Sequence, residues 1–270
     1  MTISANYRSF MVKALEAAGE IRSSEWSQVV ERVPRELFVG DRFLRAIDTN
    51  GPRWQEVSRS SLPIEEWLGL IYSDQTLVTQ VGGAAGELVG PPTSSSTMPG
   101  LVVRMLEDSG IRDGHRVLEI GTGTGYSTAL LSERLGAERV TSIEVDPGVA
   151  GRARQALEAA GYTPTLVNGN GLDGYPTGLP YDRIIATCSV KAVPPAWLRQ
   201  VRAGGNILTT LFGSLNAYGY VRLVVDDDGS ARGRFLPGTV SFMPARAHVP
   251  EPWTSLPKQE GRSRRTTVRP

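Results

Sequence analysis

A short hydrophobic run that ends in a glycine-rich turn constrains the fold of this chain more than any other feature of its sequence. Residues 117–126 read Val-Leu-Glu-Ile-Gly-Thr-Gly-Thr-Gly-Tyr. The apolar run predicts a buried strand, and the residues after Gly125 predict a helix. Alternate glycines permit positive φ angles and let a ligand approach the backbone closely. We therefore expect a strand, a loop and a helix, with a ligand site at the loop.

The segments around and after this turn alternate between strand and helix patterns. Strands are predicted at 116–120, 139–145, 165–167, 181–187 and 206–212, and helices at 126–135, 147–160 and 194–201. This alternation is typical of parallel strands joined by crossover helices. Residues 218–225 and 232–236 flank a turn at 226–229 and predict an antiparallel hairpin. The sequence thus indicates an α/β fold whose sheet is mostly parallel and ends in an antiparallel hairpin.

The residues before this core follow a different pattern. Apolar spacing predicts helices at 7–18 and 24–33, whereas 34–92 is irregular and ends in a Gly/Pro-rich stretch that we interpret as a long loop. We expect three regions: an N-terminal helical extension with a substrate loop at 1–92, the core with its hairpin at 93–248, and a flexible basic tail at 249–270.

Composition excludes several classes of function. The chain has 29 basic and 28 acidic residues, far from the basic excess of a nucleic-acid-binding protein. Two histidines and the single Cys188 cannot supply a tetrahedral zinc site, so we expect no metal. No apolar run of about 18 residues is present, and the first residues lack the order of a signal peptide. We expect a cytoplasmic protein that binds neither nucleic acid nor membrane.

The glycine-rich turn favours one kind of ligand. A dinucleotide fingerprint requires a third glycine where this chain has Tyr126, and a large side chain there crowds a pyrophosphate. Glu144 ends the next predicted strand, 23 residues beyond Gly121, where a carboxylate can accept both hydroxyls of a ribose. The alternative is that Glu144 is a solvated loop acid. The first interpretation predicts a nucleoside ligand without phosphates.

Four motifs resemble those of S-adenosylmethionine-dependent methyltransferases, and more narrowly the protein-L-isoaspartate O-methyltransferase family. They are VLEIGTGTGY at 117–126, SIEVD at 142–146, PYDRIIAT at 180–187 and VPRELFV at 33–39, and the resemblance covers most of 25–215. It implies a Rossmann-like class I methyltransferase fold and S-adenosyl-L-methionine as cofactor. The cofactor-binding residues it implies are Glu119, Gly121, Thr122 and Gly123 toward the methionine portion, Glu144 at the ribose, and Val145, Asn170 and Gly171 at the adenine. The family usually has Gly-Asp-Gly where this chain has Gly-Asn-Gly at 169–171.

A second departure from the family lies on the substrate side. Repair enzymes of the family carry Thr-Ile-Ser-Gln-Pro, whereas residues 93–99 here read Thr-Ser-Ser-Ser-Thr-Met-Pro. Together with YSDQTLVTQ at 72–80 and YDRIIATCSV at 181–190, this segment looks closer to a branch that methylates aspartate in ribosomally synthesised peptides, some of them graspetides processed after an ATP-grasp ligase. The resemblance implies Ser95, Ser96 and Thr97 as the groups that orient the acceptor carboxylate. The alternative is that the polar run caps a helix beginning at Pro99.

The reaction that this branch implies is methyl transfer to an aspartate side chain of a precursor peptide, after which the ester closes to an aspartimide. An aspartate with a pKa of about 3.9 is ionised at neutral pH, so no general base is required. We accordingly expect His115 and His248 to be structural or solvated and Cys188 to pack. Repair of isoaspartate is the alternative enzymatic function, and a non-catalytic adenosine-binding protein is a third.

Two further features are open at the level of sequence. Trp67, Tyr72 and Asp74 either frame a groove for the peptide or belong to a small core beneath the long loop. The basic residues of the tail either attract an acidic leader peptide or serve solubility.

Overall fold

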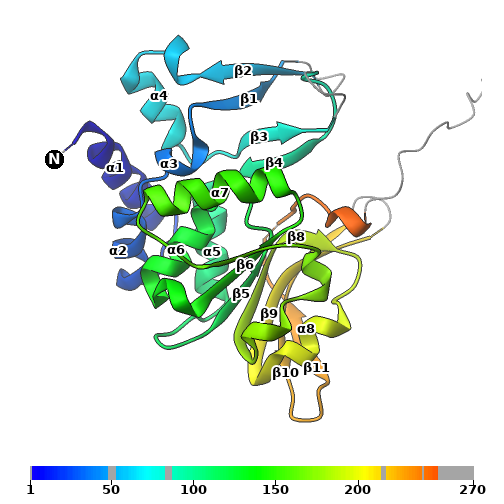
Figure 1. Ribbon diagram of the computed structural model, residues 1–270. Coiled ribbons are helices and arrows are strands. Elements are labelled where there is room, and N and C mark those ends of the chain that lie inside the picture. The colour runs from blue at the N-terminus through cyan, green and yellow to red at the C-terminus, as the bar shows by residue number, and fades with distance from the viewer. Residues whose placement is uncertain (1, 48–52, 83–86, 214–216, 239, 249–270) are drawn as a thin grey trace, which may run out of the picture.

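The computed structural model describes residues 2–47, 53–82, 87–213, 217–238 and 240–248. These residues form two sheets, one of four strands near the N-terminus and one of seven strands that carries the glycine-rich turn (Figure 1). The four-stranded sheet lies above one end of the seven-stranded sheet in this view.

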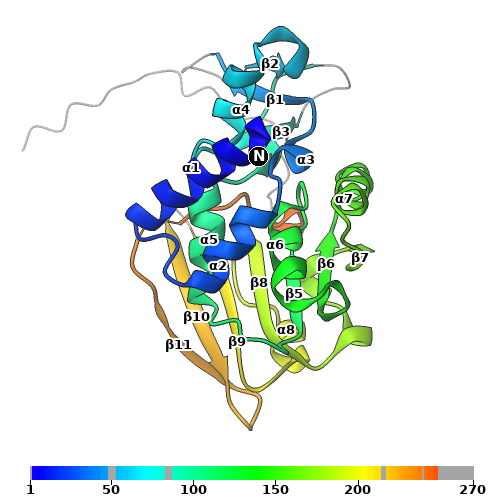
Figure 2. The same cartoon turned by 90° about the vertical axis from the view of Figure 1, so that its left-hand side faces the viewer.

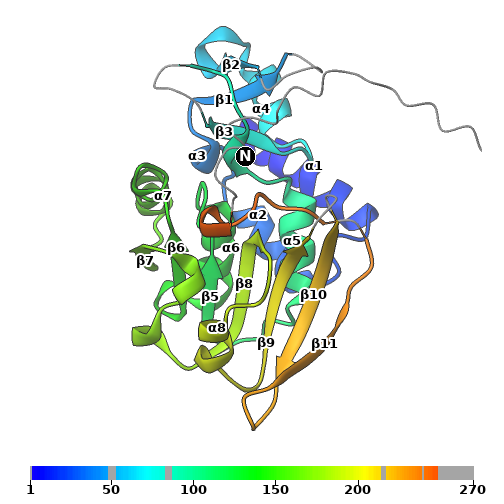
Figure 3. The ribbon, with the colours of Figure 1, turned by 90° about the vertical axis from the view of Figure 1, so that its right-hand side faces the viewer.

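The seven-stranded sheet has the order β11-β10-β9-β8-β5-β6-β7 (Figure 3). Its parallel strands are β5 (Val117–Ile120), β6 (Val140–Glu144), β7 (Thr165–Asn168), β8 (Tyr181–Val190) and β9 (Val201–Phe212). The strands β10 (Tyr218–Val225) and β11 (Ala231–Phe235) are antiparallel and form the predicted hairpin. The prediction of a mostly parallel α/β sheet is confirmed. Because the chain runs from β5 to β6 and β7 on one side and returns to β8 on the other, a crevice opens at the carboxyl ends of these strands.

Helices cover both faces of this sheet. The alternating side chains of β5 show the division, since Val117 packs in the cluster that holds the helices α1 (Ile3–Ala17), α2 (Ser24–Arg32), α5 (Pro99–Asp108) and α6 (Tyr126–Leu135). Its neighbour Leu118 faces a second cluster around Trp197 of α8 (Pro195–Gln200). Figure 2 shows α1 and α2 outside α5 and α6. The helix α7 (Pro147–Ala159) connects β6 to β7 and contacts both.

The prediction that 34–92 is irregular is wrong. This region holds the helices α3 (Glu36–Val39) and α4 (Ile64–Ile71) and the antiparallel strands β1 (Arg42–Ala46), β2 (Trp54–Ser58), β3 (Leu77–Val81) and β4 (Pro92–Ser96). The strand order is β2-β1-β3-β4. Each of these strands has five residues, and only one of the five is buried in β2 and in β3, so no alternation of buried apolar and exposed polar residues marks those two strands in the sequence. The expected boundary after residue 92 falls inside β4.

Other predicted elements differ from the structure mainly in their ends. The strands β8 and β9 are both longer than predicted. In β9 the reason is that Gly204 and Gly205 lie within the strand and interrupt its apolar pattern. The tail at 249–270 and part of the long loop, residues 83–86, lie outside the described residues. In the part of the chain that the structure describes, no helix is both long and apolar enough to cross a membrane.

A candidate cofactor and acceptor site

A cavity of about 1000 Å³, counting the part open to solvent, lies at the carboxyl ends of β5, β6 and β8. Its walls come from the glycine loop after β5, the end of β6, residues 170–172, strand β4 and the C-terminal segment 242–247. The volume is in the range of small-molecule sites. The cavity therefore joins the crevice of the core sheet to the edge of the N-terminal sheet.

The glycine loop takes backbone conformations that other residues rarely adopt. Gly121, Gly123 and Gly125 have φ angles of +97°, +54° and +91°. A Cβ on Gly121 would lie 2.6 Å from the hydroxyl of Thr187, which donates to the Gly121 carbonyl at 2.6 Å. The loop thus needs glycine for its own geometry, and Gly121, Thr122 and Gly123 all line the cavity.

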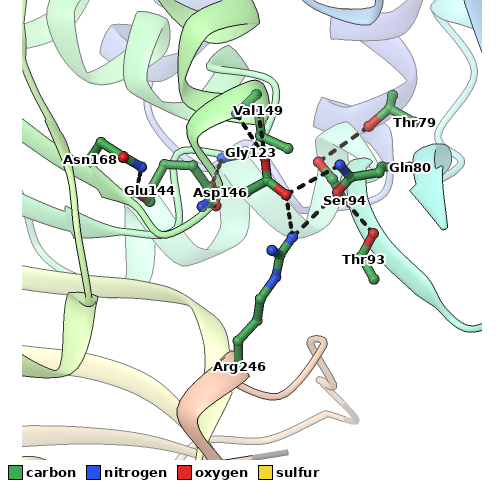
Figure 4. A network of polar contacts seen from close by, with 11 residues as sticks. Thr79, Gln80, Thr93, Ser94, Gly123, Glu144, Asp146, Val149, Asn168 and Arg246 are labelled. Carbon is green, nitrogen blue, oxygen red and sulfur yellow. Dashed lines mark hydrogen bonds and ion pairs between the residues drawn. The ribbon is translucent and has the colours of Figure 1, made fainter. Parts of the chain in front are cut away.

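Glu144 ends β6 at the wall of the cavity. Its side chain fixes the glycine loop, because Oε2 accepts a hydrogen bond from the backbone N–H of Gly123 at 2.9 Å (Figure 4). Oε1 accepts one from the N–H of Asp146 at 3.0 Å. Glu144 is only 9 % exposed, so it is not a solvated loop acid. Each carboxylate oxygen keeps further acceptor capacity, which suits the two hydroxyls of a ribose.

Glu119 does not line the cavity, contrary to the expectation that it contacts the methionine portion of the cofactor. It is 1 % exposed, and its carboxylate accepts hydrogen bonds from the hydroxyls of Ser127, Thr128 and Ser142. Burial raises the pKa of Glu119 above its usual value, and these hydroxyls partly oppose that shift. Glu119 therefore supports the loop and the start of α6 from behind.

The three residues predicted for the adenine side of the site lie together. Val145, Asn170 and Gly171 line the same cavity as Glu144. Asn170 begins a 3-10 turn, and its side-chain oxygen accepts from the N–H of Leu172 at 3.2 Å. Among the described residues its amide N–H₂ donates to no partner and can therefore donate to a ligand. A Cβ on Gly171 would lie 2.4 Å from Cγ2 of Ile120, so only glycine fits against the strand there.

The hydroxyl-rich segment divides between the cavity and the protein interior. Ser95 and Thr97 line the cavity. Ser96 does not, and it is 1 % exposed. The expectation that Ser96 contacts the acceptor is therefore wrong. The physical reason is that the segment is a strand, so the side chains of Ser95 and Ser96 point to opposite faces. The capping alternative also fails, because the N-cap residue of α5 is Met98, and the side chain that accepts from the first turn of this helix is that of Asp74, at the N–H of Gly100.

A buried arginine holds this segment from behind, and the sequence analysis did not single it out. Arg35 is fully buried and donates to the carbonyl oxygens of Ser96 and Thr97 at 3.3 and 3.2 Å. It also donates to the carbonyls of Ser73 and Gln75, both at 3.0 Å, and of Ile71. Burial lowers the pKa of Arg35 to about 10, which leaves it charged at neutral pH. The Pro-Arg pair in the motif at 33–39 was the available signal.

Trp67, Tyr72 and Asp74 do not frame a groove. Trp67 and Tyr72 are buried, and the Asp74 carboxylate accepts from the N–H of Gly100 at 2.7 Å. Trp67 and Tyr72 belong to the core beneath the N-terminal sheet, whereas Asp74 is exposed. Cys188 lines the cavity, but burial raises the pKa of its thiol to about 12. A thiol with this pKa is not a nucleophile at neutral pH.

The histidines lie away from the reacting groups. His115 accepts from the backbone N–H of Arg112 at 3.1 Å, and His248 accepts from that of Lys191 at 3.2 Å. Neither lines the cavity. Within the described ranges, no histidine is placed to act as a base there.

The charges at the cavity fit a donor with an adenosine group and no phosphates. Among the described lining residues, Arg246 is the only cation, and its guanidinium lies 2.9 Å from Oδ2 of Asp146. A pyrophosphate would therefore meet no free cation here and would approach the carboxylate of Glu144. A ribose, by contrast, finds an acceptor at Glu144, so the residues present fit S-adenosylmethionine.

Residues 54–245 match the model of the family described as protein-L-isoaspartate(D-aspartate) O-methyltransferase (PCMT). The chain belongs to this family. A protein-L-isoaspartate O-methyltransferase from Ignicoccus hospitalis is 32% identical over 236 residues, which cover 87% of this chain and 94% of that protein. The enzyme of the same name from Thermococcus sibiricus is 31% identical, with 88% and 93% covered.

Solved structures agree with this assignment. A structure named protein-L-isoaspartate O-methyltransferase has a TM-score of 0.68 and 25% identity, and the match covers 87% of this chain but 65% of that one. A Plasmodium falciparum protein named as a putative enzyme of the same activity was crystallised with S-adenosyl-L-homocysteine. Its structure has a TM-score of 0.63 at 11% identity, and the match covers 88% of this chain and 98% of that one. The two proteins share the fold. This family member is an S-adenosylmethionine-dependent protein carboxyl O-methyltransferase.

Proposed function

We propose that the protein methylates the free carboxylate of an aspartyl-type residue, aspartate or isoaspartate, in a protein or peptide. One observation carries this proposal: a single cavity is lined on one side by Glu144 and the glycine loop and on the other by Ser95 and Thr97. Glu144, Val145, Asn170 and Gly171 hold the adenosine, and Gly121, Thr122 and Gly123 face the methionine portion. The hydroxyls of Ser95 and Thr97 hold the acceptor.

The residues act by position rather than by proton transfer. S-adenosylmethionine, when bound, supplies the methyl group on its sulfonium. The acceptor carboxylate is already ionised at neutral pH, because its pKa is about 3.9. Ser95 and Thr97 each donate one neutral hydrogen bond, which orients the carboxylate and leaves the attacking oxygen a free lone pair. Alignment of this kind can lower a barrier by about 7 to 11 kcal/mol.

The comparisons favour isoaspartate as the acceptor. The relatives from Ignicoccus hospitalis and Thermococcus sibiricus are both named for this activity, and their matches extend over almost their whole length. Methylation of the misplaced carboxylate converts it to a methyl ester. The next backbone nitrogen can then attack the ester carbonyl, and methanol leaves with the nitrogen proton. Repair of damaged proteins is thus the first candidate for the biological role.

A second candidate is favoured by one observation on the acceptor side. The repair pattern Thr-Ile-Ser-Gln-Pro is replaced at 93–99, and the replaced residues Ser95 and Thr97 stand in the cavity wall. A changed acceptor wall supports a changed acceptor, here an aspartate in a ribosomally synthesised precursor peptide. In that case the next backbone nitrogen attacks the ester carbonyl, a C–N bond forms, and methanol leaves with the nitrogen proton. The product is an aspartimide.

The two candidates are separated by incubating the protein and S-adenosylmethionine with matched peptides that differ only in aspartate or isoaspartate. Mass spectrometry would detect a gain of one methyl group and then the loss of methanol. Methylation of the isoaspartyl peptide alone supports repair. Methylation of an aspartate in a precursor peptide encoded beside this chain supports the biosynthetic role. Binding of S-adenosylhomocysteine by calorimetry, without methylation of either peptide, would overturn both acceptors.

A further inference from the structure

The C-terminal segment 240–248 closes one side of the cavity and is anchored to the end of β8. The backbone N–H of Ser189 donates to the carbonyl of Met243 at 3.0 Å, and the N–H of Ala245 donates to the Ser189 carbonyl at 2.8 Å. The Ser189 hydroxyl donates to the carbonyl of Phe242 at 2.8 Å. Figure 3 shows this orange segment crossing above β10, β9 and β8 toward α6. Its path brings Arg246 to the cofactor side of the site.

Arg246 joins two parts of the molecule that lie far apart in sequence (Figure 4). Its Nη2 lies 2.9 Å from Oδ2 of Asp146, which follows Glu144 at the end of β6, and 3.3 Å from Oε1 of Gln80 on β3. The amide nitrogen of Gln80 donates to the same Asp146 oxygen at 3.3 Å. The three side chains therefore form a closed triangle, which we call the Arg246 bridge.

The Arg246 bridge continues into the acceptor strand. The hydroxyl of Thr93 on β4 donates to Oε1 of Gln80 at 2.9 Å, and the hydroxyl of Thr79 donates to that of Ser94 at 3.3 Å. At its other end, Asp146 accepts from the N–H groups of Gly148 and Val149 at the start of α7. The bridge thus ties the strand that holds Ser95 to the end of β6, where Glu144 lies.

We propose that Arg246 is a positioning residue that keeps the acceptor strand β4 aligned with the end of β6, where Glu144 lies. It acts through Gln80 and Asp146 and touches no reacting atom. The proposal rests on the proposed function, because it assigns the acceptor to β4. The family match ends at residue 245, so Arg246 lies just outside it. The side chain is 42% exposed, and an ion pair this accessible contributes little to global stability. We therefore expect loss of the Arg246 side chain to change the position of β4 and to leave the free energy of unfolding nearly unchanged.

The test compares Arg246→Met with a matched control, Arg232→Met. Arg232 also pairs with an aspartate at 2.9 Å, Asp226, but on the hairpin of β10 and β11 and outside the cavity. For Arg246→Met we expect kcat to fall about tenfold to a hundredfold, because small misplacements of reacting groups have effects of this size. The substrate is whichever of the aspartyl and isoaspartyl peptides the parent protein methylates. The Kd for S-adenosylhomocysteine, measured by calorimetry, should change less than about threefold. Arg232→Met should change neither quantity.

Two further variants test the geometry. Arg246→Lys keeps the charge but lacks the fork that reaches Asp146 and Gln80 together, so it should restore only part of kcat. The double variant Arg246→Met with Gln80→Leu should lose no more than the larger single loss, because both residues act in one bridge. The proposal would be overturned if the fold-losses in kcat of the two single variants multiply in the double variant. An unchanged kcat in Arg246→Met, or an equal loss of kcat in Arg232→Met, would overturn it as well. A loss of cofactor affinity as large as the loss of kcat would also overturn it.

Hydrogen exchange gives a readout that does not depend on the acceptor. With S-adenosylhomocysteine bound, the backbone amides of residues 93–97 should exchange faster in Arg246→Met than in the parent protein and remain unchanged in Arg232→Met. Equal exchange in all three proteins would overturn the alignment role even if neither test peptide is methylated. Faster exchange without methylation of either peptide would support the alignment role and reject only the proposed acceptors.

Discussion

The carboxylate of Glu144 binds the backbone N–H of Gly123 at 2.9 Å, so the end of β6 fixes the loop that follows β5. The other carboxylate oxygen binds the N–H of Asp146. Both oxygens therefore act as acceptors before any ligand is present. The same side chain shapes the loop and offers its remaining lone pairs to a ribose.

Replacing Glu144 with Gln should weaken cofactor binding strongly. A glutamine has one acceptor oxygen, so its N–H₂ group would face the N–H of Gly123 or of Asp146. Hydrogen bonds to a charged group contribute about 1.5–3 kcal/mol, and the Kd for S-adenosylhomocysteine should rise at least about tenfold. Calorimetry measures this change. Glu138→Gln is the control, since the side chain of Glu138 is 75% exposed and outside the cavity. Equal affinities in both variants would contradict the assignment.

We expect Thr97→Val to methylate its substrate more slowly and to bind the cofactor with unchanged affinity. The variant has nearly the same shape but cannot donate a hydrogen bond to the acceptor carboxylate, so kcat/KM should fall by about tenfold, corresponding to roughly 1.4 kcal/mol. Calorimetry with S-adenosylhomocysteine should show no change. Ser96→Ala is the neighbouring control, because the Ser96 hydroxyl is buried without a hydrogen-bond partner among the described residues. Unchanged turnover in Thr97→Val would remove this hydroxyl from the mechanism.

Two glycine substitutions should act in opposite directions. Gly121→Ala places a Cβ 2.6 Å from the Thr187 hydroxyl on a backbone with φ of +97°, so we expect a loss of about 1–3 kcal/mol in the free energy of unfolding. Gly151 lies inside α7 with open space around it. Gly151→Ala should stabilise the protein by about 0.5–1 kcal/mol. Chemical denaturation compares the two variants, and a stable Gly121→Ala would show that the loop tolerates a side chain.

The Asp146 carboxylate should remain ionised at every pH at which the protein works. Burial alone would raise its pKa, but the hydrogen bond from Val149 and the contacts with Arg246 and Gln80 outweigh burial and lower the pKa to about 2. A depressed pKa contributes stability above the ordinary value of 3.8, and this contribution is lost as the pH falls toward 2. The difference in unfolding free energy between the parent protein and Asp146→Asn should therefore be constant from pH 5 to 8 and shrink from pH 4 to 2. A difference that does not change with pH would contradict the depressed pKa.

The core was predictable because its signals are local. The helix α6 has the predicted bounds, since a glycine precedes it at residue 125 and another follows at residue 136. The family resemblance implied that Glu144 and Gly171 share one site, and both line the cavity at the carboxyl ends of the parallel strands.

The errors have a common physical origin in side-chain direction and long-range contact. In a loop, Ser95 and Ser96 could both face the ligand, but pairing of β4 with β3 sends them to opposite sides. Glu119 lies within a strand motif, and its burial depends on hydroxyls from α6 and β6. Arg246 reaches Asp146 across 100 residues, and no local pattern marks such a contact.

The buried guanidinium of Arg35 has a consequence for how this enzyme can diversify. It recognises only main-chain oxygens along the acceptor segment, including those of Ser96 and Thr97. Side chains at these positions can be exchanged while the path of the peptide chain is preserved. A new substrate preference can then evolve by point substitutions in this segment without a change in its backbone path.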